Sequence, residues 1–172
     1  MRKLLTIIMA LFLLVFCTAC GAENNTEKGD DNSGAVVPSV DKDNSYVFTY
    51  EGTDLYVGDV FSATLLPQAE SVYEVPSCAI EGTDNVYNYG TFELTTFNDV
   101  SKEVIYSIYI TDANTPTNEG LYLGDNITQM ESAYGMEYER TDNQVVYAKG
   151  ESRLIFILQN DIVISIEFRM AT

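Results

Sequence analysis

Residues 121–135 read LYLGDNITQMESAYG, and a weaker copy of this stretch, LYVGDVFSATLLPQAE, occupies residues 55–70. Each copy begins with apolar and aromatic residues that favour a strand, and a Gly-Asp pair follows. The glycine gives the backbone freedom for a sharp turn, and the aspartate is a suitable N-cap for a helix. The two copies therefore predict a duplicated unit that contains a strand and a short helix.

The spacing of apolar residues supports a helix after each Gly-Asp pair. In the second copy, one helical face would carry Ile127, Met130, Ala133 and Tyr134. Asp125 is its predicted N-cap and Gly135 a suitable C-terminal stop. In the first copy Asp59 is the predicted N-cap, and Pro67 denies a backbone donor, so the helix is expected to end near Leu66.

Sequence rich in strand-forming residues follows each predicted helix. In the second unit, strands are predicted at 144–149, 152–158 and 162–168, with a tight hairpin turn at 159–161. In the first unit, 86–97 is strand-like with a bend at Gly90, and 103–110 forms a further strand.

Alternation of apolar and polar residues predicts which side chains of the two final strands face the core. One face of the last strand would bury Ile162, Ile164, Ile166 and Phe168. The corresponding face of 103–110 would carry Val104, Tyr106, Ile108 and Ile110.

These elements predict an α+β fold of two tandem repeats, 45–118 and 119–172. Each repeat would be a short helix packed on antiparallel strands, and one continuous curved sheet is one way to join them. The offset between copies shrinks from about 66 residues at the Leu-Tyr motif to about 58 at the last strand, which indicates a shorter loop in the second copy.

The first twenty residues have the pattern of a processed leader. Arg2 and Lys3 precede an apolar run, and residues 17–20 read CTAC. This pattern resembles the lipobox of bacterial lipoproteins, although Cys17 stands where leucine is usual. It predicts that residues 1–19 are a signal peptide. It also predicts that the Cys20 thiol carries membrane lipid, which would hold the chain on the extracytoplasmic face of the cell membrane.

Composition divides the rest of the chain. Residues 20–44 are polar and acidic and predict a lipidated cysteine followed by a flexible tether, whereas 45–172 are long enough for a single domain. The net charge of -17 becomes -19 when Arg2 and Lys3 leave with the signal peptide. A charge this negative argues against binding nucleic acid through a basic patch.

The residues offer little for catalysis. The chain has no histidine, which excludes imidazole bases and histidine-ligated metals, and we predict no catalytic residue, cofactor or metal site. Cys78 reads as a small buried side chain, with a reactive thiol as the alternative. The loop 112–119, with Asp112 and Glu119, offers oxygen ligands for calcium, but Pro116 equally fits a solvated connection.

Twelve tyrosines are the remaining suggestive feature. Tyrosine is enriched at contact surfaces, so a tyrosine-bearing sheet face could receive a protein or a glycan of the envelope. The candidate binding residues are Tyr87, Tyr89, Tyr106, Tyr109 and Tyr147. The alternative is that tyrosines cover a thin core, and both interpretations stay open at this point.

The lipobox, the acidic tether and the paired Leu-Tyr-(Val/Leu)-Gly-Asp phrases resemble those of small surface lipoproteins from Gram-positive anaerobes. The expected architecture is similar to the tandem repeat of β-lactamase-inhibitor-like proteins and to the single unit of the SmpA/OmlA lipoproteins. This resemblance implies a non-enzymatic protein-binding or envelope-assembly module. The alternative function is a surface lipoprotein that binds a small ligand or calcium.

Overall fold

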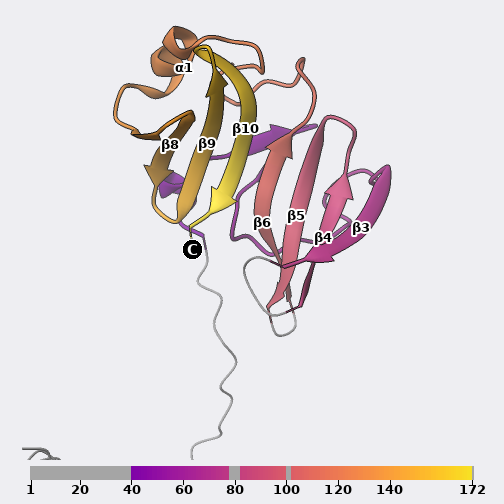
Figure 1. Cartoon of the computed structure of the whole chain (residues 1–172). Helices are drawn as coiled ribbons and strands as arrows, with labels where there is room; N and C mark the ends of the chain where they lie inside the picture. The colour runs from indigo at the N-terminus through magenta and orange to yellow at the C-terminus, as the bar shows by residue number, and fades with distance from the viewer. Residues whose placement is uncertain (1–39, 78–81, 100–101, 172) are drawn as a thin grey trace, which may run out of the picture. The chain divides into compact units, whose positions relative to one another are not determined.

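The computed structural model describes residues 40–77, 82–99 and 102–171, and its elements are labelled as in Figure 1. The predicted signal peptide, Cys20, the tether up to residue 39 and Cys78 lie outside the described residues. Residues 40–44, assigned to the tether by sequence, include a 3-10 helix, η2 (Lys42–Asn44), and Lys42 forms a 3.1 Å ion pair with Asp59. No helix in the described part of the chain is long and apolar enough to cross a membrane.

Eight antiparallel strands form one sheet in the order β3-β4-β5-β6-β10-β9-β8-β7 (Figure 1). Their bounds are β3 (Ser71–Pro76), β4 (Thr83–Asn88), β5 (Phe92–Asp99), β6 (Lys102–Ile110), β7 (Glu139–Thr141), β8 (Gln144–Lys149), β9 (Ser152–Gln159) and β10 (Ile162–Met170). Strands β3 to β6 form one meander and β7 to β10 another, and the two meanders meet where β6 pairs with β10. A separate two-stranded sheet pairs β1 (Phe48–Tyr50) with β2 (Thr53–Leu55).

The expected α+β fold with a helix in each repeat is wrong. The described residues are mostly β-structure and contain one α-helix, α1 (Ile127–Tyr134), which belongs to the second copy. The first copy has turns and bends where its helix was expected, and residues 121–123 are not a strand.

Local capping explains why only the second copy is helical. Asn126, not Asp125, is the N-cap of α1: its side chain accepts from Gln129 N, and the Gln129 side chain accepts from Asn126 N. This reciprocal pair satisfies two backbone donors at the start of a helix. The corresponding residues of the first copy, Val60 and Ala63, cannot make it, and Pro67 follows within one more turn.

The two Gly-Asp pairs nevertheless make the same backbone contacts. Gly58 N donates to Ile105 O at 2.7 Å, and Ile105 N donates to Asp59 O at 2.9 Å. In the second half, Gly124 N donates to Val163 O at 2.8 Å and Val163 N donates to Asp125 O at 2.8 Å. Each motif therefore pairs with the beginning of the last strand of its own meander.

Strands predicted from β-rich sequence are largely confirmed. The strand at 144–149 matches β8, and those at 152–158 and 162–168 lie within β9 and β10. The turn between β9 and β10 places Asn160 and Asp161 at φ 52° and 60°, as a two-residue hairpin turn requires. The bend at Gly90 separates β4 from β5. Strands β1, β3 and β7 were not predicted.

Bulges overturn only part of the predicted core faces of the two final strands, because Ile166, Phe168, Val104, Ile108 and Ile110 are buried as predicted. The β9–β10 register shifts between Val163 and Ser165, and the β5–β6 register shifts between Thr95 and Thr96, opposite residues 105–107. An inserted residue reverses the alternation of faces on either side of it. Val163 is consequently buried, whereas Ile162 and Ile164 are exposed. In β6 the same shift buries Ile105 in the main core.

The main core lies on one face of the large sheet, under β1, β2 and α1. Phe48 of β1 contacts Phe92 of β5 at 5.0 Å between ring centroids and Phe168 of β10 at 5.8 Å, so one ring touches both meanders. Met130 is the buried residue of α1, with Ile127 and Tyr134 packed against the same core, as the helical spacing predicts.

Candidate binding surfaces

Two of the five candidate tyrosines are core residues. Tyr89 is buried and stacks on Phe92, with 4.8 Å between centroids and 14° between planes. Tyr147 is buried as well, and its hydroxyl donates to Gly135 O at 2.7 Å. Burial raises the pKa of both phenols. These two side chains cover the core, which is the alternative that the sequence left open.

Tyr87 belongs to a polar cluster around Glu103. Three side chains donate to Oε1 of Glu103: Asn85 Nδ2 at 2.9 Å, Tyr87 Oη at 2.8 Å and Thr96 Oγ1 at 2.5 Å. Burial, followed by the hydrogen bond to Glu103, raises the pKa of Tyr87 to about 12. Phe61 packs on the Tyr87 ring at 4.8 Å between centroids. With three donors on one carboxylate oxygen, the cluster ties β4, β5 and β6 together.

Tyr106 and Tyr109 lie on β6 and are the more accessible candidates. Tyr106 sits at the bulge of this strand, partly buried, with its ring edge-on to Phe97 at 6.4 Å. Tyr109 is exposed and lies directly opposite Glu167 of β10. Of the five candidates, Tyr109 is therefore the one whose side chain is free to meet a partner.

The sheet ends in a long edge strand at β3. Ser77 N donates to Gly82 O, directly opposite in the β3–β4 register, at 3.0 Å. Ser77 and Gly82 are therefore a hydrogen-bonded pair, and hydrogen-bonded and non-hydrogen-bonded pairs alternate along an antiparallel ladder. Val72 and Glu74 lie an odd number of residues from Ser77, so their backbone N–H and C=O groups point away from β4. Within the described residues, no other backbone group bonds to Val72 or Glu74. The side chains of Val72 and Tyr73 are 55% and 44% exposed.

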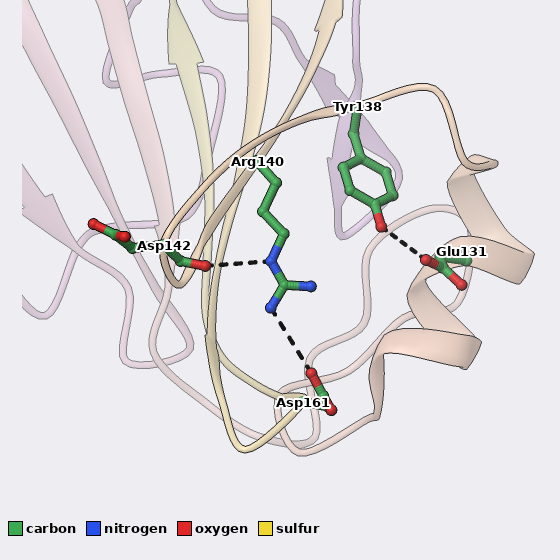
Figure 2. A network of polar contacts seen from close by, with 5 residues as sticks. All are labelled: Glu131, Tyr138, Arg140, Asp142 and Asp161. Atoms are coloured by element: carbon green, nitrogen blue, oxygen red, sulfur yellow. Dashed lines mark hydrogen bonds and ion pairs between the residues drawn. The ribbon is translucent and has the colours of Figure 1, made fainter.

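The opposite edge, β7, is short and flanked by side-chain contacts (Figure 2). Tyr138 Oη donates to Glu131 Oε1 of α1 at 2.8 Å. Arg140 Nε donates to Asp142 O at 3.2 Å, and its guanidinium lies 3.8 Å from Asp161 in the β9–β10 turn. Figure 2 shows Arg140 reaching across to that turn. An edge of three residues with a charged side chain offers little to another strand, whereas β3 is twice as long.

A cavity of about 600 Å³ lies where the first described residues meet the ends of β5 and β10. Its apolar lining includes Val57, Phe97, Val104 and Met170. Three carboxylates, those of Asp41, Asp99 and Glu151, also line it. Asp41 and Glu151 are exposed, whereas Phe97 and Val104 are buried, so the acidic groups lie at the solvent end.

The acidic loop 112–119 uses its carboxylates internally. Asp112 accepts from Asn114 N at 3.2 Å and from Thr115 Oγ1 at 3.3 Å, which closes a turn. Glu119 accepts from the Tyr134 hydroxyl at 2.6 Å. In the part of the chain that the structure describes, no three acidic, cysteine or histidine side chains gather in a group able to hold a metal ion.

Sequence reasoning missed the β3 edge, the Glu103 cluster and the cavity. The run Val72-Tyr73-Glu74-Val75 is rich in strand-forming residues and could have predicted β3. The other two sites assemble residues distant in sequence, so no local signal could have found them. Comparison with protein-family models, curated proteins and solved structures gave no match to this chain.

Proposed function

We propose that this chain is a membrane-anchored extracytoplasmic lipoprotein whose β-rich domain is a non-enzymatic protein-binding module of the cell envelope. The leader and Cys20 support the anchor, and the acidic residues before Val40 support a tether. The observation that carries the binding role is the edge strand β3. Its outward backbone groups at Val72 and Glu74 can pair with an extended segment of a partner protein.

The side chains around this edge indicate a partner of opposite charge. Strands β3, β4 and β5 carry no lysine or arginine, and Glu74 and Glu93 present carboxylates that are exposed and partly exposed. Glu93 accepts from the hydroxyl of Tyr73 at 3.0 Å, which holds that exposed ring beside an acidic group. A partner strand with lysine or arginine beside apolar residues would complement both the acidic groups and the exposed apolar side chains of this edge.

Site-specific crosslinking in the native membrane tests this role. Photoreactive p-benzoylphenylalanine would replace Tyr73 in the full lipidated chain, with replacement of Tyr122 as the matched control. Both tyrosines are comparably exposed, at 44% and 39%, and Tyr122 lies beside α1 rather than on the edge strand. We expect a crosslinked envelope protein from position 73 that is absent from position 122.

Two further variants separate edge pairing from anchoring. Val72→Pro removes one outward N–H without touching the β3–β4 hydrogen bonds, because an edge strand tolerates proline on its solvent side. We expect it to abolish the crosslink while the protein stays folded. Cys20→Ala should release the protein from the membrane fraction. Equal crosslinking from positions 73 and 122, or a crosslink that survives Val72→Pro, would contradict pairing at β3, and glycan-only recovery would contradict a protein partner.

A further inference from the structure

The cavity defined above lies at a position of the first half, Val104, whose counterpart in the second half is open to solvent. Val104 and Ile162 are corresponding residues, because each forms an isolated bridge to the motif of its own half, with Val60 and with Asn126. Val104 is 1% exposed, whereas Ile162 is 39% exposed. Asp41, Asn44 and Ser45, with the turn at Gly150 and Glu151, complete the walls around the first position. The two halves therefore differ at this position, which is covered in the first half and open in the second.

The lining combines an apolar floor with acidic groups at the mouth. Val57, Phe97 and Val104 are buried, and Met170 is partly buried beside them. None of the lining residues is a lysine or an arginine. Lys42 is paired with Asp59, and Lys149 and Arg153 donate to the backbone oxygens of the lining residues Ser45 and Gly150. The charged side chains of the lining, those of Asp41, Asp99 and Glu151, are all negative and favour a cationic group at the mouth.

The acidic groups do not have the arrangement of a metal site. A hard cation requires several oxygen ligands within bonding distance of one point. No such group of three carboxylates exists among the described residues, and these three border a space of about 600 Å³. A dispersed set of carboxylates over an apolar floor instead suits a larger cation that carries its charge at one end.

We propose that this cavity binds an organic cation, an ammonium group attached to an apolar body. The apolar body would lie on Val57, Phe97 and Val104, and the removal of its apolar surface from water would favour binding. The ammonium group would lie at the mouth, near Asp41, Asp99 and Glu151. The volume falls within the range of about 300–1,000 Å³ that is typical of small-molecule pockets. This site is separate from β3, so it stands or falls independently of the protein-binding role.

The test uses three probes of similar shape and different charge: 2-phenylethylammonium, 2-phenylethanol and 3-phenylpropionate. Titration of the full-length protein would be followed by NMR of the methionine methyl groups. Met170 lines the cavity, whereas Met136 is 76% exposed and does not line it. We expect the ammonium probe to shift the Met170 signal saturably, with an affinity at least about fivefold above that of the alcohol, and no response to the carboxylate.

A charge-matched pair of variants separates the cavity from the overall negative charge. Asp41→Asn, Asp99→Asn and Glu151→Gln together should remove the preference for the ammonium probe over the alcohol. The control removes three exposed carboxylates away from the cavity by Glu137→Gln, Glu139→Gln and Asp142→Asn, and should keep the preference. All six positions are exposed or partly exposed, so the fold should tolerate the changes.

Three results would overturn the proposal. Equal affinity of the ammonium and alcohol probes would exclude recognition of the charge. Equal affinity of methylammonium and 2-phenylethylammonium would exclude a role for the apolar floor. Equal loss of binding in both triple variants would assign the effect to net charge rather than to this cavity.

Discussion

Tyr109 of β6 and Glu167 of β10 are direct cross-strand partners and also occupy corresponding positions in the two halves of the sheet. The correspondence follows from the motif contacts: Ile105 bonds to the first Gly-Asp pair as Val163 bonds to the second, and Tyr109 and Glu167 each lie four residues further along. The two meanders are thus related by an approximate two-fold axis through this pair. Both final strands carry a bulge just before it.

The bulge in β10 can be tested with two isoleucines of the same strand. Ile166→Ala removes a fully buried side chain and should lower the free energy of unfolding by about 2–5 kcal/mol. Ile164→Ala should cost less than about 1 kcal/mol, because this side chain is 48% exposed. Urea unfolding measures both. Equal losses of unfolding free energy in the two variants would contradict the bulge and support the regular alternation of buried and exposed residues that the sequence suggests.

The start of α1 depends on Asn126 rather than on Asp125. Asn126→Ala removes the acceptor for Gln129 N and should cost about 0.5–2 kcal/mol in unfolding free energy. Thr128→Ala, at an exposed position of the same first turn, is the control and should cost nothing measurable. Thermal unfolding of the two variants gives the comparison, and a neutral Asn126→Ala would be inconsistent with this cap.

Tyr87 links stability to alkaline pH. Its pKa is raised from 10.0 to about 12, so the folded state holds the phenol proton more tightly than the unfolded state does. The resulting stabilisation is complete below pH 10 and declines as the pH rises from about 10 to 12. In Tyr87→Phe this proton is absent. The unfolding free energy of the variant should therefore fall less than that of the wild type when the pH rises from about 9 to 11.

Denaturant unfolding at several pH values measures this difference. Tyr134 and Tyr147, whose pKa values burial also raises, are present in both proteins and do not affect the comparison. Glu103→Gln keeps an acceptor for Tyr87 but removes its charge, and should give an intermediate pH dependence. Parallel curves for the wild type and Tyr87→Phe would show that the cluster is not coupled to pH.

The contacts around β7 should matter more for local order than for global stability. Arg140 and Asp161 are 42% and 67% exposed and 3.8 Å apart, so Arg140→Ala should cost no more than about 1 kcal/mol. Tyr138→Phe removes the hydrogen bond to Glu131 and should accelerate amide exchange in β7. Exchange in β9 serves as the internal reference. A large global loss in Arg140→Ala would assign this pair a greater role.

Sequence reasoning located the elements that local chemistry specifies. The β9–β10 turn and the C-terminal stop of α1 at Gly135 were correctly placed, because each depends on a few adjacent residues. The prediction of a helix in the first copy was wrong because the two copies share the Gly-Asp pair but not the capping residues that follow it. The motif in fact specifies a bridge to the final strand, a contact between residues far apart in the sequence.

The candidate sites were predicted less well for the same reason. Tyrosine content suggested a contact surface, but residue type alone does not distinguish Tyr89 and Tyr147 in the core from Tyr109 on the surface. The bulges determine which side chains point inward, and a bulge leaves no clear mark in a run such as Ile162 to Ile166. The cavity arises from six separate segments, so its chemistry emerges only after folding.

The seam between β6 and β10 also determines the order in which the chain can fold. Each meander is built of hairpins between neighbouring segments, which close rapidly, whereas the seam joins strands separated by about 58 residues. When synthesis has delivered only the first meander, the edge of β6 around Tyr109 still lacks its neighbour. A nascent chain therefore carries two open strand edges, β3 and β6. Protection against aggregation is most needed before β10 has paired with β6.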